Sequence, residues 1–367
     1  MKVALIQDQL LTKAGSERVF LHLCDEFKEA DIFTLCYNRK STWPEFQNKK
    51  ITTHWLGRFI KNHQIFKICF PLSTFLMQMW NFRDYDLIIS SSATTAKYIK
   101  NHNGFHLCYC YFPTRAIWNS NVYFRSDSGL VGKGINMVMG LLRRRDINAA
   151  RRVDKFIAIS DVTKKAIRTI YDMDSEIVFS PIVLPSIEKK ESAVVKSNYY
   201  LLVSRLEKWK LVEYAIKAFN ELGLNLYVIG TGPEESVLRS QANSNIVFLG
   251  SVSDSELSKY YAEAQAVVFT PELEYGLVPL EAAAHGTITI ALGRGGVLET
   301  MICDDGQVTK ELAIFFPDPT SESLKDAVNR CQKTEITSEE LIRHSKKFAV
   351  HSFQNQIRNI ADRVMMR

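Results

Sequence analysis

Apolar runs of strand length alternate with helix-period segments in the second half of the chain. Residues 199–204 form a β-rich run, which leads through a charged turn into apolar positions at helical spacing over 211–222. The pattern repeats with an apolar run at 224–229, a helical segment at 234–241 and another apolar run at 246–249. Strands and helices that alternate at these lengths predict a parallel sheet with helices on both faces.

The first half shows the same alternation. Residues 2–7 and 86–91 are typical of buried strands, apolar residues recur at helical spacing from Val19 to Phe27, and 107–112 is a third strand-like run. A chain of 367 residues is too long for one ordinary core, so two α/β domains are expected.

Two domain boundaries follow from the pattern. The segment 181–198 contains two prolines and a charged cluster, which is typical of a linker. We therefore expect one domain at 1–184 and a second at 185–345. The helical residues 346–367 are expected to cross back to the first domain.

Charged residues follow the strand at 199–204. Ligands of parallel α/β sheets bind at the carboxyl ends of the strands. Arg205 and Lys210 fall there, five residues apart. A guanidinium and an ammonium so placed suit the two phosphates of a diphosphate.

Glycines mark further phosphate-loop candidates. Gly276 precedes a helical segment whose first N–H groups attract anions. Gly15 and Ser16 lie at the first strand-to-helix turn, where backbone amides suit a phosphate. The alternative for Ser16 is a helix N-cap.

Several of these positions together resemble the retaining glycosyltransferases of family 4, which have the two-domain GT-B fold, and within them the bacterial O-antigen mannosyltransferases. The matching residues are Ser204-Arg205 with Lys210, Gly230-x-Gly232-Pro233-Glu234, Phe248-Leu249-Gly250, Gly276 to Ala282, and Gly295-Gly296-x-x-Glu299. The resemblance implies an α/β fold of two Rossmann-like domains that face each other across a cleft.

The resemblance also implies roles for single residues. Arg205 and Lys210 would stabilise the leaving diphosphate, and Glu281 would accept hydrogen bonds from the ribose hydroxyls. The implied donor-binding residues are Gly15, Ser16, Gly230, Leu249, Gly276, Leu277, Val278 and Glu281. Arg115 and Trp118 would hold the acceptor or a phosphate; the alternative for Arg115 is structural pairing.

The sequence departs from the family pattern at four positions, and at the first of them Ser16 stands in place of the second of two adjacent glycines. Tyr111 and Ala93 stand where the family has histidines, and Leu273 stands where it has a glutamate that contacts the donor sugar. Tyr111 therefore occupies the expected catalytic centre. Glu274, next to Leu273, is the expected substitute carboxylate.

The favoured activity is transfer of a hexose, mannose from GDP-mannose above others, to a lipid-linked or growing polysaccharide acceptor. Three alternatives stay open: a UDP-sugar-dependent transferase, a catalytically weakened scaffold subunit of a polysaccharide assembly complex, and a sugar-nucleotide epimerase. The absence of Gly-x-Gly-x-x-Gly argues against a nicotinamide dehydrogenase.

Basic charge gathers in the first half. Residues 1–185 hold 26 Lys and Arg against 16 Asp and Glu, a net charge of +10, within a total of +6. No recognition-helix or RNA-binding signature is present, so we expect an anionic membrane or lipid diphosphate rather than nucleic acid. The candidate surfaces are 56–80, which mixes cations with aromatic residues, and the basic helix 143–152. The alternatives are a core helix pair and a solvated helix face.

The remaining chemistry bears on compartment and metal. Seven scattered cysteines are typical of reduced thiols, no run has the ~18 apolar residues of a membrane span, and the N-terminus has the pattern of a strand rather than a signal peptide. We expect a cytoplasmic protein, peripheral at the inner membrane. Asp84-x-Asp86 and Asp172-x-Asp174 precede strands, so neither a metal nor another cofactor is expected.

Overall fold

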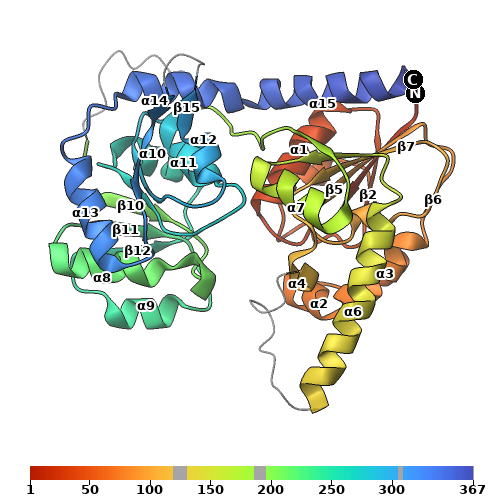
Figure 1. Cartoon of the computed structure of the whole chain (residues 1–367), viewed down its shortest axis with the longest axis horizontal. Coiled ribbons are helices and arrows are strands. Elements are labelled where there is room, and N and C mark those ends of the chain that lie inside the picture. The colour runs from red at the N-terminus through yellow and green to blue at the C-terminus, as the bar shows by residue number, and fades with distance from the viewer. Residues whose placement is uncertain (119–129, 186–195, 305–308, 367) are drawn as a thin grey trace. The chain divides into compact units, whose positions relative to one another are not determined.

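The computed structural model describes residues 1–118, 130–185, 196–304 and 309–366. They form two compact units (Figure 1). Unit 1 comprises Met1–Ser180 and Phe353–Arg367, and unit 2 comprises Pro181–Ser352. The chain thus changes units four residues before the predicted boundary. Ile182 already belongs to unit 2, because its N–H donates to Phe348 O at 2.9 Å.

Unit 1 is built on a seven-stranded sheet in which every pair is parallel. The strand order is β3 (Ile51–Thr53), β2 (Asp31–Thr34), β1 (Val3–Gln7), β5 (Leu87–Ser92), β7 (Phe105–Cys110), β8 (Lys155–Ala158) and β9 (Ser175–Ile177). The order reverses between β1 and β5, and such a reversal opens a crevice at the carboxyl edge of a doubly wound sheet. The short strands β4 (Asn81–Phe82) and β6 (Asn101–His102) pair separately.

Helices surround this sheet (Figure 1). They are α1 (Gly15–Glu26), α2 (His63–Ile68), α3 (Phe70–Gln78), α4 (Arg115–Trp118), α6 (Leu130–Ala150), α7 (Asp161–Tyr171) and α15 (Val350–Met365), with the 3₁₀ turns η1 (Pro44–Asn48), η2 (Trp55–Phe59) and η3 (Ala96–Tyr98). The end of the chain is fixed to α1, since Arg358 pairs with Glu26 at 2.7 Å and Gln354 donates to His22 O. Phe353 packs edge-on against Tyr109 of β7.

Unit 2 repeats the architecture with six parallel strands. Their order is β12 (Ile246–Gly250), β11 (Leu226–Ile229), β10 (Tyr200–Val203), β13 (Val267–Phe269), β14 (Thr289–Leu292) and β17 (Ala313–Phe316). The helices are α8 (Val212–Leu222), α9 (Glu235–Gln241), α10 (Asp254–Glu263), α11 (Leu277–Ala284), α12 (Val297–Thr300), α13 (Ser321–Cys331) and α14 (Ser338–Ser345), with the turns η4 (Lys208–Lys210) and η5 (Lys346–Phe348) and the hairpin β15 (Ile302–Asp304) and β16 (Thr309–Glu311). The strand order reverses between β10 and β13.

The predicted strands and helices between 199 and 249 agree with the structure to within two residues, whereas the predicted helix 346–367 is divided into a 3₁₀ turn at Lys346–Phe348 and a helix at Val350–Met365. All seven cysteines lie in the described residues as free thiols. No helix in the described part of the chain combines the length and apolar composition that a membrane span needs.

Candidate functional site

The loop from Arg205 to Leu211 leaves the carboxyl end of β10, beside the reversal of strand order. Its 3₁₀ turn η4 ends at Lys210, and the next residue, Leu211, is the N-cap of α8 with φ 57° and ψ 29°. A side chain at positive φ is strained. The loop that carries both predicted cations therefore ends on a strained residue.

Both cations have partners within this loop. The Arg205 side chain is 59% exposed, and its guanidinium pairs with the carboxylate of Glu207, which also accepts a hydrogen bond from the indole N–H of Trp209. The Lys210 ammonium lies over the Trp209 ring, 4.1 Å from its centroid. The structure thus brings Arg205 and Lys210 to one turn, and an anion that binds Arg205 must compete with Glu207. Sequence reasoning missed Glu207.

Thr270 fixes the loop across the reversal of strand order. It follows β13 and is buried, and its hydroxyl donates to Lys210 O at 2.7 Å. Lys210 N–H in turn donates to Glu207 O at 2.8 Å. The backbone of the predicted lysine is therefore held from both sides, by a threonine that no sequence motif had singled out.

The glycines after β11 serve contacts between loops. Gly230 has φ 130°, and a Cβ there would lie 1.9 Å from Ser204 O; a Cβ on Gly232 would lie 2.2 Å from Leu206 O. Leu206 N–H donates to Thr231 O at 3.0 Å. Gly230, predicted to bind the donor, thus allows the β11 loop to pack on the loop that holds Arg205. Leu249 of β12 packs against the core of unit 2, so its backbone is what remains for a ligand.

Two further glycines hold the loop before α11. A Cβ on Gly295 would lie 2.3 Å from Leu273 O, and a Cβ on Gly296 would lie 2.1 Å from Glu274 O. Gly296 N–H donates to Leu273 O at 2.8 Å. Leu273 therefore contributes a backbone anchor here, and the neighbouring Glu274 is partly buried.

The α11 helix begins directly after this loop. Gly276 is its N-cap residue and no side chain caps it; a Cβ on Gly276 would lie 2.8 Å from the Phe269 ring. The N–H groups of a first helical turn have no partners within the helix. Leu277 and Val278 occupy that turn, at the carboxyl edge where Arg205 and Lys210 lie.

Glu281 lies one turn further along α11. Its Oε2 accepts a hydrogen bond from Tyr261 OH at 2.9 Å. Burial and then the Glu281 charge raise the pKa of Tyr261 well above its ordinary value, so the phenol stays a donor. The predicted ribose acceptor is thus oriented by a buried tyrosine that sequence reasoning missed.

In unit 1, Tyr111 and the loop at Ser16 come together. Tyr111 follows β7, and its hydroxyl donates to Ser16 O at 3.0 Å and lies 3.0 Å from Ser91 Oγ. Burial raises the pKa of Tyr111 well above its ordinary value. The alternative of Ser16 as an N-cap is wrong, because Ala14 is the N-cap and the Ser16 hydroxyl donates to Glu17. Gly15 opens α1.

The turn at Ala93 binds a carboxylate of the protein itself. Asp8, buried after β1, accepts the backbone N–H groups of four successive residues at 2.6–2.9 Å. These are Ala93, Thr94, Thr95 and Ala96. Asp8, which sequence reasoning missed, thus fixes the backbone at Ala93, the position where the family has a histidine.

Trp118 belongs to a buried ionic network. Its indole N–H donates to Asp146 at 2.7 Å, and the fully buried Asp146 pairs with the ammonium of Lys97 at 3.0 Å. Burial acts to raise the pKa of Asp146. The charge of Lys97 and the hydrogen bonds to the carboxylate outweigh burial and hold that pKa below its ordinary value. The polar atom of Trp118 is therefore used within unit 1. The Arg115 guanidinium lies 5.8 Å from the centroid of the Phe112 ring.

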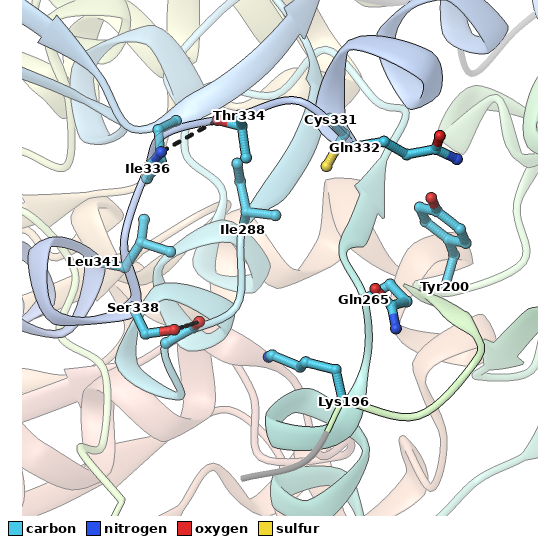
Figure 2. Close-up of a pocket in the computed structure, with 11 residues that line it drawn as sticks. Lys196, Tyr200, Gln265, Ile288, Cys331, Gln332, Thr334, Ile336, Ser338 and Leu341 are labelled. Carbon is cyan, nitrogen blue, oxygen red and sulfur yellow. Dashed lines mark hydrogen bonds between the residues drawn. The ribbon is translucent and has the colours of Figure 1, made fainter. Parts of the chain in front are cut away.

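A cavity of ≈ 200 Å³ lies at the opposite, amino edge of the second sheet (Figure 2). Tyr200, which opens β10, and Ile288, which precedes β14, line it. The Lys196 ammonium donates to Ala262 O at 2.9 Å and to Thr287 Oγ1 at 2.6 Å, and burial lowers its pKa to about 8. None of the predicted site residues lines this cavity.

Among the described residues, no three His, Cys, Asp or Glu side chains gather in a way that could hold a metal ion. Asp86 instead accepts Lys2 N–H at 2.7 Å, and Tyr85 between the two aspartates donates to Asp31.

The fold and the carboxyl edge define the class of the protein. The structure of HepE from Anabaena in complex with UDP is similar to this chain, with a TM-score of 0.69 at 17% sequence identity. The match covers 99% of this chain and 100% of the HepE chain. Residues 185–348 match the family model described as glycosyl transferases group 1. The chain is a GT-B glycosyltransferase. The match of residues 185–348 to the group 1 family and the GT-B fold of the whole chain confirm the resemblance and the predicted pair of Rossmann-like domains.

Two relatives of the chain are named as mannosyltransferases. Alpha-1,3/1,6-mannosyltransferase ALG2 of Kluyveromyces lactis is 23% identical over 82% of this chain and 71% of its own length. O-antigen chain mannosyltransferase C of Escherichia coli is 26% identical over 42% of each chain.

Leu211→Gly should stabilise the protein by up to ~1 kcal/mol, because a left-handed conformation costs a side chain about 1–2 kcal/mol and costs glycine little. Chemical denaturation of the two proteins measures it. Gly223→Ala is the reciprocal control at the other end of α8: Gly223 has φ 67° and open space around a Cβ, so that variant should lose stability. A loss in both would contradict the assignment of strain to Leu211.

Thr270→Val should destabilise by about 1–3 kcal/mol, since it leaves the carbonyl of Lys210 without its hydroxyl partner. Thr289→Val is the matched control. Thr289 is buried in β14, and its hydroxyl has no hydrogen-bond partner among the described residues, so valine should cost little there. Equal losses in the two variants would show that the hydroxyl of Thr270 does not fix the loop.

Proposed function

We propose that this glycosyltransferase moves a hexose, with retention of anomeric configuration, from a nucleotide sugar to a glycan acceptor. The observation that carries the proposal is the convergence of Arg205, Lys210 and the first turn of α11 on one edge of the second sheet. Such an edge at a reversal of strand order suits a nucleotide. The cations and helix amides suit its two phosphates.

The chemistry follows from where charge develops. As the bond to the sugar breaks, negative charge grows on the leaving diphosphate, and preorganised donors stabilise that growth. Arg205 supplies a planar fork and Lys210 a point charge. Glu281, oriented by Tyr261, would accept hydrogen bonds from the ribose hydroxyls, and Glu274 would contact the donor sugar.

Mannose from GDP-mannose is the favoured donor because the relatives above are named as mannosyltransferases. UDP-glucose is the second candidate, since a structure of HepE is described in complex with it. We propose a lipid-linked or growing surface glycan as the acceptor. We also propose that the enzyme acts at an anionic, cytoplasmic membrane face.

Arg205→Ala and Lys210→Ala should each lower turnover ~10²-fold or more, because each removes a preorganised electrostatic partner. Stability should change little, since Arg205 is largely exposed. Arg205→Lys should restore activity only in part. The measurements are melting temperature and sugar transfer on the same preparations.

Arg330→Ala is the matched control, because Arg330 is an exposed arginine of α13 that pairs with Asp326. It should keep wild-type turnover. Wild-type turnover in stable Arg205→Ala and Lys210→Ala variants would remove the diphosphate assignment.

Binding of a nucleoside diphosphate should not need a divalent cation, because Arg205 and Lys210 supply the positive charge. Calorimetric titration of GDP and of UDP, with and without EDTA, measures this. Affinity that collapses in EDTA and returns with added Mg²⁺ or Mn²⁺ would contradict it.

A further inference from the structure

The exposed apolar side chains of unit 1 form two stripes. Along α2 and α3, Ile68, Leu72, Phe75 and Met79 recur at helical spacing and are all exposed, Ile68 to 80%. Along α6, Met137, Val138 and Leu141 are exposed, Met137 to 76%. We call these seven residues the α3–α6 face. The sequence had indicated 56–80 as a whole and had not indicated the apolar stripe of α6.

The opposite side of α3 supplies the core. Phe70, Leu76 and Met77 are buried, as are Ile60 and Phe66 before them. The alternative of a core helix pair is thus correct for one side of these helices only. The other side presents apolar residues to solvent, where a surface helix would ordinarily be polar.

The helices that carry the two stripes are in contact. The Arg145 guanidinium of α6 stacks on the Phe75 ring of α3 at 3.6 Å from its centroid. Phe70 and Leu142 also share a core cluster beneath them. The helices gather at one end of unit 1 (Figure 1). Contiguous exposed apolar patches mark interaction sites.

Within the described residues of the segments that carry the two stripes, the exposed charges are cationic. Residues 46–83 contain no acidic residue. Lys61, Lys67 and Arg144 are exposed. Asp146, the acidic residue of α6, is buried against Lys97. Arg152, which the sequence had placed in the basic helix surface, instead donates to the backbone carbonyls of Ile99 and Asn148.

We propose that the α3–α6 face inserts into the interface of an anionic lipid bilayer, with its apolar residues among the lipids and Lys67 and Arg144 at the headgroups. Apolar residues bordered by cations alone are suited to such a surface. A second copy of the chain fits less well. A two-fold contact would bring the cations of one copy close to the same cations of the other, and like charges repel. The inference deepens the membrane partner of the proposed function and rests on it.

The test is sedimentation with phosphatidylcholine vesicles and with vesicles that also contain phosphatidylglycerol, at low and high salt. Recovery should be greatest with the anionic vesicles at low salt, since salt screens the attraction. Ile68→Ser/Leu72→Ser and Met137→Ser/Leu141→Ser should each weaken binding about tenfold or more, because burial of one large apolar side chain stabilises by more than a tenfold change in affinity. Lys67→Glu/Arg144→Glu should abolish the preference for anionic vesicles.

Val237→Ser/Val247→Ser, at exposed valines of unit 2, is the matched control and should bind vesicles as the wild type does. GDP and UDP titrations on every variant separate the two proposals, because the α3–α6 variants should keep wild-type nucleotide affinity. Equal recovery with both vesicle types, or no effect of the serine pairs, would overturn the inference. So would a dimer in light scattering that the serine pairs dissociate.

Discussion

Close contacts between backbones, at glycines, hold together the carboxyl edge of the second sheet. Ser204 and Leu206 meet Gly230 and Gly232, and Leu273 and Glu274 meet Gly295 and Gly296, all at distances that a Cβ would forbid. These contacts fix the loop with Arg205 and Lys210 and the loop that leads into α11. The predicted donor residues of unit 2 depend on them for their places, with Thr270 as the tie between the two loops.

In unit 1, buried charged groups fix the loops at the carboxyl edge of the sheet. Asp8 fixes the turn after β5 through four amides, and the Lys97–Asp146 pair holds Trp118 and the last turns of α6. A buried charge without partners costs several kcal/mol, so each of these groups fixes the elements that satisfy it. The carboxyl edge of the first sheet is therefore built from groups whose hydrogen bonds are largely made within the protein.

Much of this fold was predictable from local pattern. Strands such as 246–249 and helices such as 211–222 are encoded by periodicity that their own residues carry, and the parallel sheets follow from their alternation. Partners distant in sequence were not predictable. The residues around Glu281 give no sign of its contact with Tyr261, and those around Lys210 give no sign of its contact with Thr270. Both contacts arise only when the chain folds. The motif glycines stand out in the sequence, but the contacts that the structure shows for them are between loops of the protein. Exposure was equally hidden, since Phe70 and Leu72 look alike in the sequence and lie on opposite sides of α3.

The central claim is that a nucleoside diphosphate binds at the carboxyl edge of the second sheet. Hydrogen–deuterium exchange with and without GDP or UDP tests it most directly, because amides near the ligand should exchange more slowly once it binds. The account predicts slower exchange over residues 204–211 and 276–280. Slower exchange confined to residues 286–288 and 331–338, around the cavity at the amino edge, would contradict it, as would binding that left both regions unchanged.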